Sequence, residues 1–92
     1  MIKSWKHSGL QEFFETGSTR KINAAHEKRL RERLRVIDLA EKVEDMNLGG
    51  YRLHALKGDR RGLWSITVTG NWRITFEFRD GNAFILNYED YH

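Results

Sequence analysis

The apolar residues of the N-terminal half recur at the spacing of an amphipathic α-helix. The apolar face of a first helix would consist of Leu10, Phe13 and Phe14. Ser8 and Gln11 form a capping-box pattern at the start of this helix, and Gly17 is placed to stop it because glycine tolerates the left-handed conformation of a C-terminal cap. These signals predict a short helix between positions 8 and 17.

A second, longer helix is predicted by apolar residues at i, i+4 and i+7 spacing, namely Leu30, Leu34 and Ile37. Asn23 can cap this helix, because its side-chain oxygen can accept from an exposed backbone N–H. A further short helical turn is expected within residues 40–48, and the glycine pair that follows it interrupts the chain.

From position 51 onwards the hydrophobic period changes to two, which is typical of half-buried β-strands. Strands are predicted at residues 2–5, 51–56, 64–68, 72–79 and from 83 to the C-terminal residues. Residues 57–62 are predicted to form a loop. In the strand at 72–79, Ile74 and Phe76 would face one side of the sheet and Arg73 and Thr75 the other.

The pair Asp80-Gly81 is a strong two-residue hairpin signal. A loop of this length would place Phe76 opposite Ile85 and Arg73 opposite Tyr88. On that register the face that carries Arg73 also carries Tyr88, Asp90 and, if the strand continues, His92. A bulge in either strand would change this parity.

Helices gathered in one half and strands in the other predict an α+β fold, with N-terminal helices packed on one face of an antiparallel sheet. The 92 residues suffice for a single domain, residues 1–92. Because 39% of the residues are hydrophobic, a core can form, which excludes global disorder. The absence of cysteine excludes a disulfide scaffold and a thiolate zinc site.

The chain is predicted to be cytoplasmic and to make no membrane contact. No apolar stretch approaches the roughly 20 residues that span a bilayer. The first residues also lack the apolar run of a signal peptide. The absence of cysteine fits a reducing compartment.

Positive charge is concentrated in two segments, although the net charge of the chain is only +3. The first cluster consists of Lys28, Arg29, Arg31, Arg33 and Arg35. The second consists of Lys57, Arg60 and Arg61. Such clusters attract phosphate-rich partners, and we assign the first cluster, together with Arg60 and Arg61, to RNA or ribosome binding. The alternative for the first cluster is a solvated helix face with intrahelical pairs such as Glu27–Arg31.

Several residues of the strand-rich half could together cleave RNA without a metal. That chemistry needs a base for the ribose 2′-hydroxyl, cations for the developing phosphorane charge and an acid for the departing 5′-oxygen. The candidate acids and bases are His54, Asp90 and His92. Lys57 and Arg73 could balance the phosphate charge, and Tyr91 could stack on a base.

Each of these residues also has an ordinary structural explanation. His54 could be a surface histidine, and Lys57 a solvated loop lysine. Arg73 could form an ion pair with Glu89 or Asp90 on the sheet surface, and the last three residues could form a structural terminus. Only the convergence of these groups favours a site.

No metal or other cofactor is predicted. The sequence has no His-Glu-x-x-His motif, no acidic cluster with recognisable ligand spacing and no glycine-rich phosphate loop. His7 and His26 have no obvious partner and are assigned no role.

The sequence resembles the HigB toxins, a branch of the RelE/ParE toxin superfamily, in three segments. They are residues 51–60, residues 64–68 together with 71–76, and residues 87–92. The blocks most specific to this branch are Leu56-Lys57-Gly58-Asp59-Arg60 and Asp90-Tyr91-His92. The resemblance extends over nearly the whole chain, and it implies a twisted antiparallel sheet with helices packed on one face.

The resemblance also implies an activity, a site and partners. HigB-like toxins belong to type II toxin–antitoxin pairs, enter the ribosomal A site and cut messenger RNA during translation without a metal cofactor. In this chain the family's functional positions fall on His54, Lys57, Arg73, Asp90, Tyr91 and His92, all with matching residue types. The implied partners are the 70S ribosome, messenger RNA and a HigA-like helix-turn-helix antitoxin, through which the toxin would meet operator DNA.

Two other functions stay open at this point. A ParE-like protein of the same fold would inhibit DNA gyrase without cutting RNA, and a catalytically idle module would only bind RNA or the ribosome. The complete acid–base and cation set favours cleavage, because a pure inhibitor has no need for it. We therefore predict a messenger RNA endoribonuclease in which the ribose 2′-hydroxyl is the nucleophile.

Overall fold

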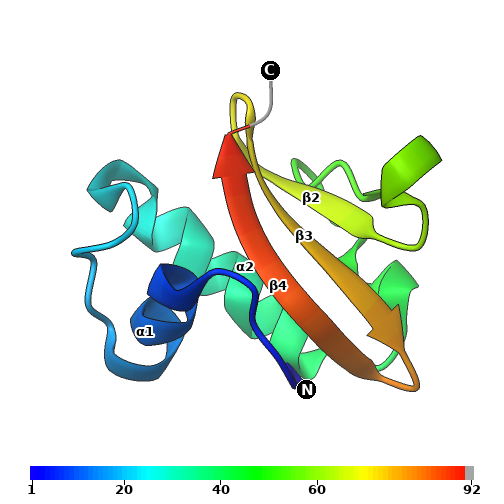
Figure 1. Cartoon of the computed structure of the whole chain (residues 1–92), viewed down its shortest axis with the longest axis horizontal. Coiled ribbons are helices and arrows are strands. Elements are labelled where there is room, and N and C mark those ends of the chain that lie inside the picture. Colours follow the sequence, from blue (N-terminus) through cyan, green and yellow to red (C-terminus); the bar gives the residue numbers. More distant parts are fainter. Residues whose placement is uncertain (91–92) are drawn as a thin grey trace.

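Helices and strands form two layers in the computed structural model, which describes residues 1–90 (Figure 1). The two α-helices are α1 (Ser8–Thr16) and α2 (Glu27–Leu39), and short 3₁₀ segments are η1 (Ala24–His26), η2 (Val43–Met46) and η3 (Gly58–Arg60). The strands β1 (His54–Ala55), β2 (Trp64–Thr69), β3 (Trp72–Arg79) and β4 (Asn82–Asp90) form one antiparallel sheet in the order β1-β2-β3-β4. The predicted α+β fold is confirmed.

The first helix ends as predicted but begins differently. Gly17 adopts a φ of 81° and its N–H bonds the carbonyl oxygen of Phe13, which closes the C-terminus of α1. The N-terminal cap is His7, whose Nδ1 accepts from the Leu10 N–H at 2.9 Å. The expected Ser8 capping box is therefore wrong, because the imidazole nitrogen satisfies the exposed backbone donor.

The second helix follows the predicted pattern closely. Asn23 caps the 3₁₀ turn η1 by accepting from the Ala25 N–H at 3.0 Å, and η1 leads directly into α2. Leu30, Leu34 and Ile37 are at most 1% exposed, so their stripe faces the core.

The strand predicted at residues 51–56 is shorter than expected, because only His54 and Ala55 pair with β2. Arg52 has a φ of 49°, a left-handed conformation that interrupts an extended chain. The opening segment is likewise reduced to two parallel bridges, Ile2 with Ala83 and Trp5 with Leu86, which place it beside β4 (Figure 1).

The β3–β4 hairpin has the predicted turn, but its register changes partway along the strands. Asp80 and Gly81 have φ values of 53° and 77°, as a type I′ turn requires, and Arg79 pairs with Asn82. Between the pairs Glu77–Phe84 and Thr75–Asn87, β4 contains one extra residue, which makes a β-bulge.

The bulge overturns two predicted pairings. Arg73 lies opposite Glu89 instead of Tyr88, while Tyr88 lies opposite Ile74. The expected Phe76–Ile85 pairing is also absent from the register, and Ile85 itself has a φ of 50°. Because side chains alternate along a strand, one added residue exchanges the two faces for the rest of β4.

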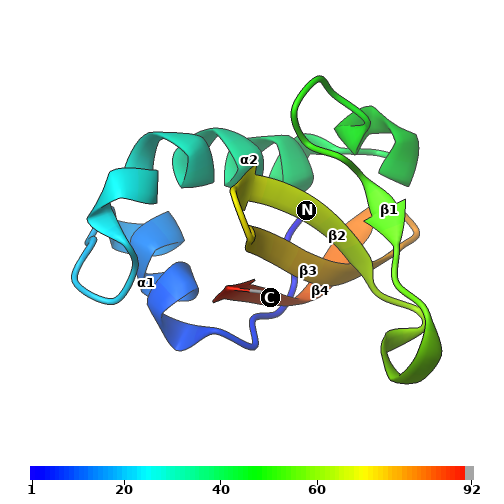
Figure 2. The ribbon, with the colours of Figure 1, turned by 90° about the horizontal axis from the view of Figure 1, so that it is seen from above.

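The sheet therefore has two different faces. We call the face that packs against the helices the inner face; it carries Ile66, Val68, Ile74, Phe76, Leu86 and Tyr88. We call the opposite face the outer face; it carries His54, Ser65, Thr67, Arg73, Thr75, Asn87 and Glu89. Figure 2 shows α2 along one side of the sheet and the η3 segment on the other. Within residues 1–90, no helix is long and apolar enough to cross a membrane.

Candidate active site

The outer face carries two cross-strand rows of polar residues. The first row runs from β1 to β4 through His54, Ser65, Thr75 and Asn87. The second runs from β2 to β4 through Thr67, Arg73 and Glu89. Neighbouring strands lie about 4.8 Å apart, and residues two apart on one strand are roughly 7 Å apart. Long side chains from both rows can therefore reach one common surface.

The two middle residues of the first row carry hydroxyl groups and are buried. Ser65 is 0% exposed and Thr75 is 1% exposed, although both belong to the outer face. The Ser65 Oγ has no hydrogen-bond partner among the described residues. A ligand on the outer face would therefore meet the longer side chains around Ser65 and Thr75, not these two hydroxyl groups.

His54 is exposed at the β1 end of the first row. Its Nδ1 lies 2.9 Å from the carbonyl oxygen of Arg52. A carbonyl oxygen only accepts, so Nδ1 carries the proton and donates it. In the neutral ring the lone pair is then on Nε2, which can act as a base. The contact favours the neutral tautomer in which Nε2 is free to accept a proton.

Lys57 and the predicted cations Arg60 and Arg61 lie on the loop that follows β1. The base of this loop is closed by the Leu56 N–H, which donates to the carbonyl oxygen of Leu63 at 2.9 Å. At the η3 segment, Arg60 Nη1 contacts Glu89 Oε1 of β4 at 2.5 Å. This contact holds the loop to the outer face, while Lys57 and Arg61 remain exposed.

Arg73 occupies the centre of the second row, half-buried between Thr67 and Glu89. His54, Lys57 and Arg73 therefore belong to the outer face and the loop above it. A guanidinium at this position could bind a phosphate through two parallel N–H donors.

Asp90 is the last described residue, and the register places it opposite Trp72 on the inner-face side of the strand. The expectation that it shares a face with Arg73 is wrong, because the bulge reverses the parity of β4. Both residues still lie at the same end of the β3–β4 ladder. Tyr91 and His92, also predicted to be catalytic, lie outside the described residues.

Beneath this end of the sheet lies an aromatic cluster that the sequence did not predict. His26 is 6% exposed, and its Nδ1 is 2.6 Å from the Tyr88 hydroxyl. The His26 ring also makes an edge contact with Trp72 at a centroid distance of 5.2 Å. Burial lowers the pKa of His26, Arg29 lowers it further, and Asp90 opposes them; burial raises the pKa of Tyr88. His26 and Tyr88 are 62 positions apart in the sequence, and no local sequence pattern predicted their contact.

The first basic cluster divides into structural and exposed residues. Arg33 is 6% exposed; its Nε donates to the Thr67 carbonyl oxygen at 2.7 Å, and its guanidinium lies 4.3 Å from the centroid of the Tyr51 ring. It therefore fastens α2 to the sheet and is not accessible to a ribosomal phosphate. The exposed members are Lys28, Arg29, Arg31 and Arg35.

Two of the exposed members make contacts of their own. Arg29 Nη1 donates to the Val68 carbonyl oxygen at 3.2 Å. Arg31 forms the predicted ion pair with Glu27, which confirms the intrahelical pairing. Both residues are nevertheless exposed.

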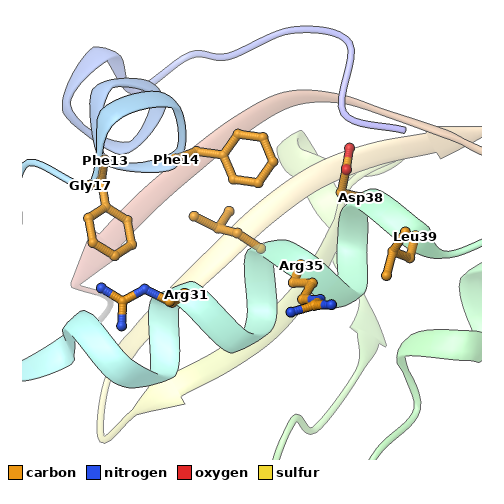
Figure 3. A pocket seen from close by; sticks show the side chains of 8 residues that line it. Phe13, Phe14, Gly17, Arg31, Arg35, Asp38 and Leu39 are labelled. Atoms are coloured by element: carbon orange, nitrogen blue, oxygen red, sulfur yellow. The ribbon is translucent and has the colours of Figure 1, made fainter.

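Two hollows lie away from the outer face. One of about 420 Å³ lies between α1 and α2 and is lined by Phe13, Phe14, Gly17, Arg31, Leu34, Arg35, Asp38 and Leu39 (Figure 3). The other, of about 520 Å³, is lined by Lys28, Arg29, Glu32, Arg33, Gly49 and Gly50. Neither is lined by a predicted catalytic residue. Within residues 1–90, no group of three or more histidine or acidic side chains could hold a metal ion.

The chain is similar to known proteins along its whole length. Residues 3–92 match the family described as the RelE-like toxin HigB of type II toxin–antitoxin systems. The chain is 55% identical to Endoribonuclease HigB of Proteus vulgaris, with all of both chains covered. It is 31% identical to Toxin HigB-1 of Vibrio cholerae serotype O1, with 100% of this chain and 98% of the relative covered.

One solved structure with a similar fold is the YoeB-YefM complex from Staphylococcus aureus. The similarity has a TM-score of 0.64 and covers 100% of this chain and 95% of the other. Sequence identity is 19%, so this likeness bears on the fold alone.

Proposed function

This chain belongs to the HigB family of RelE-like toxins of type II toxin–antitoxin systems, and we propose that it inhibits growth by cutting messenger RNA in the ribosomal A site. Family membership makes it an RNA-cleaving toxin with an antitoxin partner. The proposal adds where it cuts and how. The observation that supports it is the outer face, which carries His54 with its Nδ1 contact to the Arg52 carbonyl oxygen, the half-buried Arg73, and the contact that joins the cationic loop to β4.

In the proposed reaction the nucleophile belongs to the substrate. A base takes the proton of the ribose 2′-hydroxyl, and the 2′-oxygen forms a bond to the adjacent phosphorus. The bond from phosphorus to the 5′-oxygen breaks, an acid protonates that oxygen, and a 2′,3′-cyclic phosphate remains. No step requires a metal ion. The proton-transfer groups would be His54, Asp90 and His92.

The cations would act on the charge that develops on the phosphate oxygens. Arg73 would bind the phosphate with two N–H donors, and Lys57 would approach from the loop as a point charge. Such donors act most strongly when charge appears in the transition state. Tyr91 would stack on a base beside the cut.

The remaining basic residues would hold the toxin on ribosomal RNA. We assign this role to Lys28, Arg29, Arg31, Arg35, Arg60 and Arg61, and we omit Arg33 because its guanidinium is buried. The ribosome would then orient the messenger RNA and make a modest site effective. The antitoxin would be a HigA-like helix-turn-helix protein that binds operator DNA, and toxin and antitoxin would meet in the cytoplasm.

A single experiment tests both the site of action and the nucleophile. Purified 70S ribosomes carrying a defined messenger RNA are incubated with the toxin, and RNA ends are mapped with and without a 2′-deoxy substitution at the cut nucleotide. We expect cutting in the A-site codon, a cyclic or 3′-phosphate end, and loss of cutting on the deoxy substrate. Normal cutting of the deoxy substrate would overturn the mechanism. Inhibition of DNA gyrase with intact RNA would overturn the proposed function.

A further inference from the structure

A carboxylate lies among the cations of the outer face. Glu89 belongs to the second row, directly opposite Arg73 on β3. The Cβ atoms of such a pair are about 4.5–5.5 Å apart. On its own, a negative charge here would repel the phosphate that the proposed site has to bind. Its presence therefore needs an explanation beyond solubility.

Both oxygens of this carboxylate are engaged by neighbouring side chains. Glu89 Oε1 contacts Arg60 Nη1 at 2.5 Å, and Glu89 Oε2 accepts from Asn87 Nδ2 at 2.9 Å. The two side chains of the ion pair are 34% and 24% exposed for Arg60 and Glu89, so both are largely covered. Glu89 is thus held in one orientation by its own strand and by a loop 29 residues away.

The contact between Arg60 and Glu89 matters more for the position of the loop than for that of β4. Among the described residues, the loop's backbone bonds stay within the loop or close its base: the Arg60 N–H donates to the Lys57 carbonyl oxygen, the Arg61 N–H to that of Gly58 and the Leu56 N–H to that of Leu63. These local bonds shape the 3₁₀ turn but do not fix its position over the sheet. The contact with Glu89 joins the turn to β4, next to Arg73.

We infer that Glu89 is a positioning residue, which places Arg60 and the loop carrying Lys57 so that the RNA phosphate binds between this loop and Arg73. The inference rests on the proposed function, because it concerns the same site. A guanidinium has five N–H donors, and the contact with Glu89 uses Nη1. Arg60 can therefore donate to a phosphate while Glu89 holds it.

The test uses Glu89→Gln, which keeps the shape of the side chain and removes its charge. We expect cleavage at saturating ribosome concentration to fall about 10-fold, less than the roughly 10² that a misplacement of 1 Å can cost. The ribosome concentration at half-maximal rate should change far less, because Glu89 contacts only Arg60 among the six cations of the proposed docking set. The matched control is Glu77→Gln, since Glu77 pairs with Arg79 at 2.6 Å on the same sheet but away from the site. This control should cut normally.

A second variant separates positioning from a direct effect. If Glu89 acts through Arg60, the double variant Arg60→Gln/Glu89→Gln should cut no more slowly than Arg60→Gln alone. Additive losses would overturn the inference, as would faster cutting by Glu89→Gln. Circular dichroism and thermal melting establish that each variant is folded.

The failure of this inference is distinguishable from the failure of the proposed function. If the wild-type toxin cuts no ribosome-bound RNA, the proposed function is wrong. If the wild type cuts and Glu89→Gln cuts equally well, only the positioning role is wrong.

Discussion

The two ends of the β3–β4 ladder are built from similar residues and differ in what those residues contact. At the hairpin end, Arg79 pairs with Glu77 of its own strand, and both side chains are exposed. At the opposite end, Arg60 of the loop that carries Lys57 pairs with Glu89, which is 29 positions away in the sequence and lies opposite Arg73. We call these the hairpin end and the open end.

The difference shows that ion-pair chemistry alone does not make a site. A solvent-exposed pair between neighbours on one strand adds about 0–1 kcal/mol to stability and joins no distant element of the fold. The pair at the open end joins the loop after β1 to β4, and it holds Arg60 on the same face of the sheet as Arg73. The bulge in β4 divides the two ends, because it decides which residues face outward beyond it.

The strongest test of this comparison removes one arginine from each end. Arg73→Ala should reduce ribosome-dependent cleavage about 10²–10³-fold, because it removes a donor that stabilises charge in the transition state. Arg79→Ala should cut at a rate close to that of the wild type. RNA cleavage with purified ribosomes measures both effects.

Growth inhibition in cells gives an independent measurement of the same pair of variants. A well-expressed, folded Arg73→Ala protein that remained fully toxic would contradict the assignment of Arg73 to the site. Equal loss in both variants would erase the distinction between the two ends.

The second test concerns the inner face beneath the open end, where His26 and Tyr88 share a hydrogen bond. His26→Leu leaves the buried Tyr88 hydroxyl without this partner and should lower the free energy of unfolding by about 1–3 kcal/mol. Chemical denaturation at pH 7 measures this loss. His54→Leu, at an exposed position, should lower stability far less.

The lowered pKa of His26 also predicts that the stability of the protein depends on pH. Burial lowers the pKa of His26, so the unfolded chain takes up its proton at a higher pH than the folded protein does. Stability is then fully present above the usual histidine pKa of about 6.5 and decreases as the pH falls below it. His26→Leu should flatten this decrease between pH 7 and 5. If the wild type and His26→Leu lose stability in parallel, the histidine does not cause it.

The smallest expected effect concerns docking. The double variant Lys28→Ala/Arg61→Ala should bind ribosomes with a shallower dependence on salt. If each residue contacts one phosphate, the slope of log affinity against log salt concentration should decrease in magnitude by roughly 1.4–1.8. The control removes the same charge outside the proposed set, with Lys3→Ala/Arg79→Ala. Ribosome co-sedimentation at several salt concentrations measures the slopes. If both double variants change the slope equally, net charge alone attracts the toxin and the proposed docking set has no special role.

Much of the fold could be read from local patterns. The stripe of Leu30, Leu34 and Ile37 specified the long helix, and the Asp80-Gly81 pair specified the hairpin turn. These features depend on residues close together in the chain, whose spacing and backbone preferences are visible in the sequence. The exclusion of a disulfide scaffold also came from composition alone.

The composition of the candidate site was visible in the same way, but its geometry was not. The sequence named His54, Lys57 and Arg73 as candidates, and the fold places them on one face and the loop above it. The loop's contact with Glu89 and the hydrogen bond of His26 were missed. Each joins residues separated by tens of positions, and no local spacing encodes such a pair.

By itself the sequence determined which elements form and which chemical groups are available, because propensity, periodicity and turn chemistry act over a few residues. Tertiary structure alone decided which side of β4 those groups face. A single extra residue at the bulge near Ile85 moved Tyr88 into the core and set Glu89 opposite Arg73. That choice depends on how the apolar residues of β4 pack against the helices and the rest of the sheet, a free energy distributed over the whole core.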